Sequence, residues 1–148
     1  MLGMLGITEG MEATVRWILR YQRYDGGFGT GDHSDLRSTF HAVSSLNNLG
    51  YSVRSLRRAV AFVRSCEQPL GGFSVVPIGT IPYMEDTYGG VKMLHFMGER
   101  CAYPAETANR VFKCLNSNGG FRRSIYLGIS TFEDTYLALS VLRELGEV

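Results

Sequence analysis

Apolar side chains recur along the chain at the three- and four-residue spacing that is typical of amphipathic helices. This spacing predicts six helices, over residues 8–22, 34–49 and 84–97 and in three segments that begin near Ser52, Pro104 and Ser130. Ser52 is a candidate N-cap, Pro104 suits a first helical turn, and Ser130 with Glu133 fits a capping box. The β-branched stretch at 74–78 is expected to be an extended loop, because prolines interrupt and follow it. With no convincing strand, the predicted class is all-α.

Three short motifs each occur three times along the chain at a nearly constant interval. They are Gly-Gly-Phe (26–28, 71–73, 119–121), Thr before an aromatic residue (39–40, 87–88, 135–136), and Leu or Met before Gly (49–50, 97–98, 145–146). The last two motifs recur every 48 residues, and the first at intervals of 45 and 48. Such a period is typical of stacked supersecondary units. We therefore expect residues 1–148 to form a single domain of three repeats, at about 8–50, 51–98 and 99–146, each a hairpin of two helices.

One position in the second helix of each repeat holds only small residues, namely Ala42, Gly90 and Ala138. Gly90 follows another glycine, and each glycine inside a helix costs about 0.8–1 kcal/mol relative to alanine. Two explanations would offset that cost. Either neighbouring helices approach closely at this position, or the space belongs to a cavity. The sequence leaves both open.

Composition and charge exclude several classes of protein. With 15 Lys and Arg against 14 Asp and Glu, the formal charge of +1 offers no electrostatic footprint for nucleic acid or an anionic membrane. No apolar run approaches the roughly 20 residues of a membrane span, and residues 1–7 lack the basic and apolar regions of a signal peptide. Three cysteines, an odd number without metal-ligand spacing, indicate a reducing compartment. We expect a cytoplasmic protein without a transmembrane segment.

Two stretches of the first repeat resemble the prenyltransferase/squalene-cyclase repeat family, which includes the β subunits of protein prenyltransferases and the class II terpene cyclases. Residues 22–29, Gln-Arg-Tyr-Asp-Gly-Gly-Phe-Gly, are similar to its Gln-x-x-x-Gly-x-Trp/Phe motif. Residues 35–46 are similar to the Asp-x-Arg-x-x-Tyr stretch of the protein prenyltransferases. The resemblance extends over nearly all of the chain. It implies an α/α toroid, in which inner helices line an apolar cavity and outer helices surround them.

Six helices are half of what such a toroid has, so the first and third repeats would leave apolar flanks uncovered. We expect a homodimer in which the first repeat of each chain meets the third repeat of the other and closes the ring, or another toroid-completing subunit. The alternative is an open half-toroid that docks on another protein or is cut from a longer chain.

The resemblance to the protein prenyltransferases implies zinc ligands on an Asp-x-Cys-Tyr stretch and on a later His. The corresponding residues here are Thr87, which is a poor zinc ligand, and Glu133. The loop at 74–83, where the family's basic residues would hold a prenyl diphosphate, contains no Lys or Arg. The sequence therefore argues against zinc-dependent protein prenylation, and it predicts neither a metal site nor a cofactor.

Class II cyclases protonate their substrate with an Asp-x-Asp-Asp-Thr motif, which two stretches here resemble without its first Asp. The candidate catalytic residues are Glu85 with Asp86 and Glu133 with Asp134, each Glu as the acid and each Asp as its partner. Adjacent carboxylates in a desolvated cavity raise each other's pKa, which would hold a proton for delivery. The alternative is structural, because acidic residues in the first turn complement the helix macrodipole, and Glu133 would also serve the capping box.

Five further residues are candidates for substrate binding: Arg37, Phe40, Tyr88, His95 and Tyr136. The three aromatic residues share one repeat position and would suit an isoprenoid chain or a carbocation, or would otherwise belong to the core. Arg37 matches the family's Asp-x-Arg stretch and would meet an anionic headgroup, or pair with Asp35 or Asp86. His95 follows Tyr88 by two turns, and lone histidines on helices are usually structural or solvated.

These observations lead to one hypothesis and one alternative. The hypothesis is a prenyltransferase- or terpene-cyclase-like toroid repeat protein that binds or transforms an isoprenoid or prenyl diphosphate, as a dimer that closes the ring. The aromatic set and the paired carboxylates favour it. The alternative is a non-catalytic repeat scaffold that mediates protein–protein interaction, which the missing zinc ligands, the uncharged loop and the half length favour.

Overall fold

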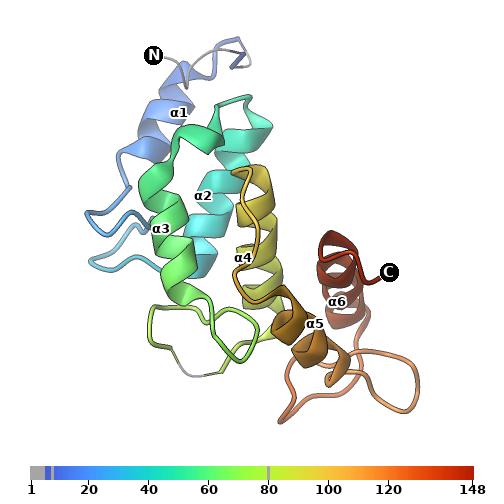
Figure 1. The fold of residues 1–148 in the computed structure, drawn as a ribbon. Coiled ribbons are helices and arrows are strands. Elements are labelled where there is room, and N and C mark those ends of the chain that lie inside the picture. The colour runs from blue at the N-terminus through green and yellow to red at the C-terminus, as the bar shows by residue number, and fades with distance from the viewer. Residues whose placement is uncertain (1–5, 8, 80) are drawn as a thin grey trace.

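The computed structural model describes residues 6–7, 9–79 and 81–148. These residues form six α-helices and one 3₁₀ turn, η2, and no extended strand (Figure 1). The helices are α1 (Glu12–Leu19), α2 (Leu36–Asn48), α3 (Arg57–Cys66), α4 (Met84–Phe96), α5 (Pro104–Phe112) and α6 (Phe132–Glu144), with η2 (Val53–Ser55) before α3. The predicted all-α class is confirmed.

The helices form two layers. The inner helices α2, α4 and α6 pack side by side, α2 against α4 and α4 against α6. The outer helices α1, α3 and α5 each pack against the inner helix that follows them in the chain, and Figure 1 shows the three hairpins following one another from blue to red. This is the hairpin arrangement expected of an α/α toroid.

Two helix starts differ from the predictions. Ser52 does not cap α3, because the chain first makes the η2 turn and the buried Val53 and Leu56 carry it into the core before the helix begins. Ser130 does not cap α6 either. Its hydroxyl is held by the side chains of Asn116 and Asn118, and the helix begins later.

At the start of α6 the capping group is Thr131, whose side chain accepts the N–H of Asp134. The capping box predicted from Ser130 and Glu133 is therefore wrong: the N-cap is one residue later, and the N–H of Thr131 donates to the carbonyl of Phe121. At the other end of the chain, the expected start of the first helix at residue 8 and the segment 1–5 lie outside the described residues, and α1 begins at Glu12.

The repeated motifs fix the turn inside each hairpin. The threonine hydroxyl of each inner helix accepts the N–H of the phenylalanine in the Gly-Gly-Phe motif, at 2.9, 3.3 and 3.0 Å for Thr39–Phe28, Thr87–Phe73 and Thr135–Phe121. The first glycine of each motif has a positive φ of 88–95° (Gly26 93°, Gly71 95°, Gly119 88°), which favours glycine. The three phenylalanines are buried. Each motif thus ties the entry of an inner helix to the end of its outer helix.

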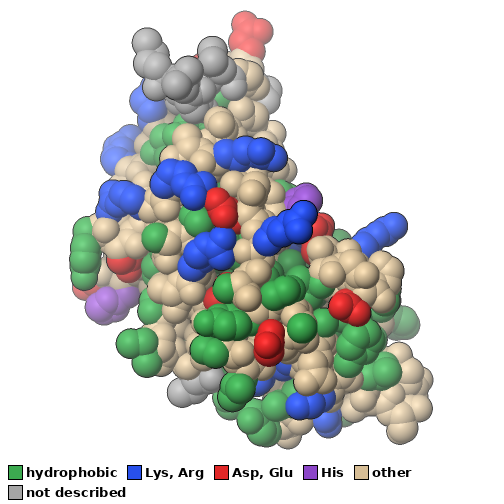
Figure 2. Space-filling model, in the orientation of Figure 1, with side chains coloured by type: hydrophobic (Ala, Val, Ile, Leu, Met, Phe, Trp, Pro, Cys, Tyr) green, Lys and Arg blue, Asp and Glu red, His purple; other side chains and the backbone are tan. Residues whose placement is uncertain are grey.

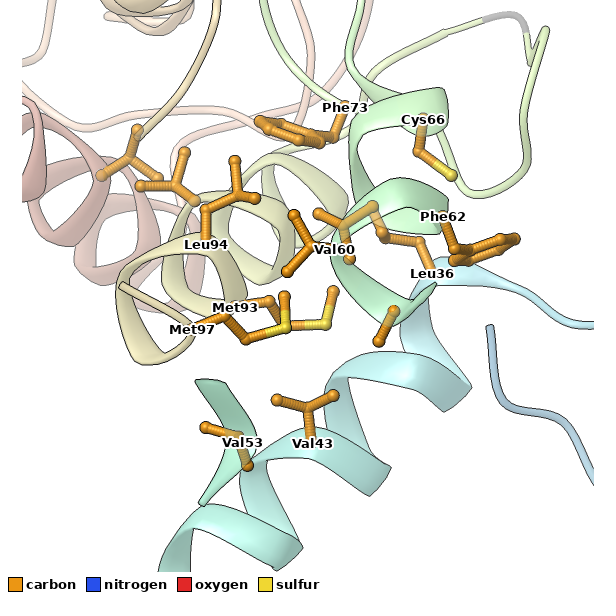
Figure 3. Close-up of a cluster of buried hydrophobic side chains, with 14 of the residues drawn as sticks. Leu36, Val43, Val53, Val60, Phe62, Cys66, Phe73, Met93, Leu94 and Met97 are labelled. Carbon is orange, nitrogen blue, oxygen red and sulfur yellow. The ribbon is translucent and has the colours of Figure 1, made fainter. Parts of the chain in front are cut away.

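The core lies between the two layers. Figure 3 shows Met93 and Met97 of α4 pointing toward Val60 of α3 and Val43 of α2, and all four side chains are buried. The core continues along the repeats through buried aliphatic residues of every helix. Burial of apolar surface on both sides of α4 makes the second repeat the centre of the domain.

The three cysteines belong to this core rather than to a reactive site. Cys66 and Cys114 are buried and Cys101 is partly buried. Burial raises the pKa of Cys66 and of Cys101 to about 12, and it also raises the pKa of Cys114. All three thiols are therefore protonated near neutral pH.

Of the three equivalent small residues in the inner helices, Gly90 of α4 is explained by close packing. A Cβ at this position would lie 2.3 Å from the ring of Phe73, the phenylalanine of the same repeat's Gly-Gly-Phe motif. The partner is therefore a loop side chain rather than a neighbouring helix. Gly89 differs, since a Cβ there would meet Phe40 at an ordinary 3.5 Å.

Side chains are unevenly distributed over the face shown in Figure 2. Most of its Lys and Arg side chains lie in the upper half, and most of its hydrophobic side chains lie in the lower half. The lower half contains the loops that join outer to inner helices (Figure 1). Within the described residues, no helix has the length and apolar character needed to cross a bilayer.

The contrast between the two glycines of α4 gives a test of the packing. We expect Gly90→Ala to lower the free energy of unfolding by about 1–3 kcal/mol, because the added methyl overpacks the site. The matched control Gly89→Ala should raise it by up to about 1 kcal/mol, because it only removes a helical glycine. Urea denaturation followed by circular dichroism measures both. Equal effects of the two substitutions would contradict the close contact with Phe73.

Candidate functional site

Six of the predicted site residues line one pocket on the inner helices. The pocket has a volume of about 200 Å³ and lies where the first turns of α2, α4 and α6 face one another. The predicted residues that line it are Arg37, Phe40, Glu85, Asp86, Tyr88 and Glu133. Residues three and four apart share one face of a helix, so the repeat positions 37/85/133, 40/88/136 and 41/89/137 form parallel rows on this surface.

An aromatic row runs across the three inner helices. The rings of Phe40 and Tyr88 are 5.7 Å apart at 71°, and those of Tyr88 and Tyr136 are 6.4 Å apart at 49°. Phe40 and Tyr88 are partly buried and Tyr136 is 63% exposed. Burial raises the pKa of the Tyr88 hydroxyl, and the neighbouring Tyr136 raises it further. The row is therefore a contiguous aromatic surface that borders the pocket, and not part of the closed core.

Arg37 is held by a carboxylate of the next repeat. Its Nε and Nη2 donate to Oδ1 and Oδ2 of Asp86 at 2.6 and 3.0 Å, and Nη2 lies 3.1 Å from Oε1 of Glu85. The Asp86 side chain has no exposed surface, whereas that of Arg37 is partly exposed. The hydrogen bond to Asp86 raises the pKa of Arg37. Of the alternatives for Arg37, the structure shows the ion pair with Asp86, and its contact with a substrate stays a prediction.

Glu85 is paired with a second arginine that the sequence analysis missed. Arg123 donates from Nε to both carboxylate oxygens, at 2.9 and 3.2 Å, and also from Nη2, while its guanidinium lies 4.1 Å from the centre of the Tyr83 ring. Burial alone would raise the pKa of Glu85, but the hydrogen bonds and charge of Arg123, with the charge of Arg37, outweigh it and lower that pKa. This shift is opposite to the one a proton donor needs at neutral pH.

A signal for Arg123 was present in the repeat. Arg123 follows Phe121 by two residues, as Val75 follows Phe73. The carbonyls of Val75 and Arg123 accept the first N–H of α2 and of α4 from Leu36 and Met84. In both cases this position lies at the start of the preceding repeat's inner helix, and at α4 the first turn there holds Glu85 and Asp86.

The remaining predicted residues are not brought into this cluster of ion pairs. Glu133 is exposed, borders the pocket, and has no ion-pair partner among the described residues. Asp134 is buried and accepts the hydroxyl of Thr131. His95 lies at the far end of α4, with Nδ1 3.1 Å from Oε2 of Glu144. The catalytic roles of the four acidic residues and the substrate contact of His95 stay predictions.

The residues at the positions of the family's zinc ligands do not fit a metal ion. The hydroxyl of Thr87 already accepts the N–H of Phe73, and the carboxylate of Glu85, at the position of the family's Asp, accepts from Arg123 and Arg37. Over the part of the chain that the structure describes, no group of three or more His, Cys, Asp or Glu side chains is placed to share a metal.

Comparison with known proteins agrees with this fold. Segments 1–35, 10–105 and 90–148 match the family described as the prenyltransferase alpha-alpha toroid domain. A solved structure described as Candida albicans protein geranylgeranyltransferase-I complexed with GGPP superposes with a TM-score of 0.77 at 20% sequence identity. The match covers 88% of this chain and 42% of that one, so this chain spans less than half of its length. No curated protein sequence matches the chain.

The family match extends over the whole chain, and the structural match agrees with the layered hairpins described above. The chain therefore belongs to the prenyltransferase alpha-alpha toroid family.

Proposed function

We propose that the inner face of the toroid binds an isoprenoid chain along the aromatic row, in a ring that a second copy of the chain completes. The observation that carries the proposal is the contiguous row Phe40–Tyr88–Tyr136, of which Phe40 and Tyr88 line the 200 Å³ pocket and Tyr136 continues the aromatic surface beside Tyr88. Aromatic faces offer an unsaturated hydrocarbon both buried area and favourable ring contacts.

Membership of the family and the geranylgeranyltransferase structure support this ligand class. That enzyme is described as complexed with GGPP, a prenyl diphosphate, and its fold resembles the present one over most of this chain. At 20% identity the likeness carries the fold alone. The ligand proposal for this chain therefore depends on its own aromatic row.

The ion pairs favour binding over proton transfer at Glu85. Its carboxylate is stabilised in the charged form by Arg123 and Arg37, and Asp86 is saturated by Arg37. If the protein transforms its ligand by protonation, Glu133 is the better candidate for the acid. It borders the same pocket and has no cationic partner among the described residues.

Repeat positions that are buried in the first two hairpins are exposed in the third. Leu36 and Met84 are 1% and 3% exposed, but Phe132 at the same position is 98% exposed. Val43 and Val91 are likewise buried, whereas Leu139 is 45% exposed. The third hairpin therefore presents the surface that the earlier hairpins use to contact the next one, and large exposed apolar surfaces favour association.

The turn glycines lead to the same inference. A Cβ on Gly26 would lie 2.0 Å from the carbonyl oxygen of Arg58, and one on Gly71 would lie 2.2 Å from that of Glu106, because the next outer helix begins against each turn. Gly119 has no atom within 4 Å of the same point. A further outer helix would fit there, and α1 of a second copy supplies one.

The first hairpin has a receiving groove on its opposite flank. A pocket of about 380 Å³ lies beside α1 and α2, and it is lined mainly by apolar groups that include Trp17, Tyr21 and Phe28. Trp17 is 52% exposed there. Contact between this groove and the third hairpin of a partner copy would repeat the packing within the chain and close the ring.

A protein scaffold is the second candidate function. It is favoured by exposed apolar side chains on the loops between outer and inner helices, which are Tyr24, Leu70, Ile78, Tyr126 and Ile129. These loops lie at one end of the hairpins, where a protein partner would cover them.

Ligand binding can be tested with geranylgeraniol, which has the chain but no phosphate, and with geranylgeranyl diphosphate. We expect both to bind, and Tyr88→Ala to weaken binding roughly fivefold, because one aromatic contact contributes about 1 kcal/mol. The matched control is Tyr24→Ala, since Tyr24 is 93% exposed on a loop. Native mass spectrometry with titration measures both. No binding of either lipid, or equal loss in the two variants, would contradict the proposal and favour the scaffold.

The contribution of the charged Glu85 carboxylate to stability can be tested by varying the pH. Because its folded-state pKa is lowered, its ion pairs stabilise the fold above the ordinary carboxylate pKa, and this contribution is lost as pH falls through the folded-state value. Glu85→Gln should therefore lower the free energy of unfolding at neutral pH and make little difference in acid. The repeat-equivalent control Glu133→Gln should change it little at either pH. Urea denaturation at neutral and at acidic pH measures the free energy of unfolding of both variants. The ion-pair assignment would be contradicted if the unsubstituted protein stayed more stable than Glu85→Gln in acid.

Ring closure predicts a mass of twice 16.5 kDa by light scattering at micromolar concentration. We expect Leu139→Asp to dissociate the dimer, because it places a charge on the apolar contact surface. Leu127→Asp, at a loop position of similar exposure, is the control that should leave the dimer intact. A monomer in the unsubstituted protein would end the dimer proposal, and it would leave the lipid experiment unaffected.

A further inference from the structure

A second pocket lies at the opposite end of the inner helices from the aromatic site. It has a volume of about 680 Å³ and is enclosed by the ends of α4 and α6 and the segment at 98–104. Small-molecule sites commonly have volumes of about 300–1,000 Å³. The residues that line it are different from those that line the pocket beside the aromatic row.

The pocket exists because one repeat lacks a side chain that another has. A Cβ on Gly98, where α4 ends, would lie 3.1–3.3 Å from the guanidinium of Arg54. At the equivalent Gly146, where α6 ends, no atom lies within 4 Å. The residue that corresponds to Arg54 in the next repeat is Ala102, 48 positions later. The volume that a guanidinium fills beside α4 is therefore open beside α6.

Three arginines without a carboxylate partner line this open volume. Arg54, Arg100 and Arg143 are exposed, and none of them forms a salt bridge with an acidic side chain among the described residues. A guanidinium presents a rigid fork of donors that matches the oxygens of phosphate and carboxylate groups.

The two carboxylates that also line the pocket are paired with other basic side chains. Both oxygens of Glu99 are taken by Arg57 and Arg64, at 2.9 and 2.8 Å. Both oxygens of Glu144 are taken by Lys92 and His95, at 2.8 and 3.1 Å. Neither carboxylate is left to neutralise the three lining arginines.

The helix ends themselves do not balance this charge. The C-termini of α4 and α6 each carry about half a negative charge, which favours nearby cations. Together they offset about one of the three positive charges that line the pocket. The local charge is unusual for a chain whose formal net charge is only +1.

We propose that this pocket is a binding site for a small polyvalent oxyanion, of the phosphate or polycarboxylate class, held by Arg54, Arg100 and Arg143. The site is separate from the aromatic row, and it does not depend on isoprenoid binding or on ring closure.

Inorganic diphosphate and citrate are the two probes, and the full chain is the protein. A saturable rise in melting temperature with either probe is expected, with a half-saturating concentration that increases with ionic strength. Tighter binding of diphosphate would identify a phosphate ligand, and tighter binding of citrate would identify a polycarboxylate ligand. Arg54→Gln and Arg143→Gln should each weaken binding about tenfold, since each removes a charge-assisted hydrogen bond.

The matched control is Arg20→Gln, which alters an exposed arginine at the end of α1, outside the pocket and in no salt bridge among the described residues. Its affinity for the probes should equal that of the unsubstituted protein. Circular dichroism verifies that each variant is folded. The proposal is overturned if neither probe binds at millimolar concentration, or if all three variants weaken binding equally, because the arginines would then serve only the helix ends or a diffuse surface charge.

Discussion

Each hairpin of this toroid depends on one hydrogen bond from the backbone N–H of a phenylalanine to a threonine hydroxyl of the inner helix, which is buried in the first two hairpins and partly buried in the third. It occurs three times, at Thr39, Thr87 and Thr135. A buried N–H without an acceptor costs about 1–3 kcal/mol, so the threonine is a requirement of the turn rather than an addition to it. The same turn places the phenylalanine in the core. In the second repeat the ring of Phe73 packs against Gly90 of α4, where a Cβ would be too close to the ring. Position and packing of the inner helices therefore follow from the turns.

Much of the fold could be predicted because these requirements are local and repeated. The spacing of Gly-Gly-Phe, Thr and Gly predicted the number of hairpins, and the apolar spacing predicted the helices. Four residues follow that apolar spacing and are all buried, namely Val53, Leu56, Val60 and Val63. The exact helix starts were less accessible. At Ser52 a short 3₁₀ turn precedes α3. At Ser130 the side chains of Asn116 and Asn118, earlier in the same loop, bind the hydroxyl. Such contacts depend on the local path of the chain, which spacing does not contain.

The candidate site was predictable in its residues but less so in its bonding. Arg37, Phe40, Glu85 and Tyr88 come together in one pocket, because equivalent positions of a repeat fall on one surface. The sequence did not determine which carboxylate pairs with each arginine. For Arg37, both Asp35 and Asp86 were possible partners. Asp35 instead accepts the N–H and hydroxyl of Ser38 at the start of α2, which leaves Asp86 for the arginine. Arg123 escaped notice because it lies 38 residues from Glu85, on a loop whose position only the neighbouring repeat defines.

The cysteines lie where the outer layer meets its neighbours, with Cys66 at the end of α3 and Cys101 and Cys114 on either side of α5. Since burial raises the pKa of Cys66 and Cys101 to about 12, these thiols carry almost no thiolate in the closed domain. Alkylating reagents would reach the buried Cys66 and Cys114 only when an outer helix separates from the inner layer, whereas Cys101 is partly exposed. The cysteines are thus native chemical probes of local opening in the domain. They lie in the second and third hairpins, and the first hairpin has none.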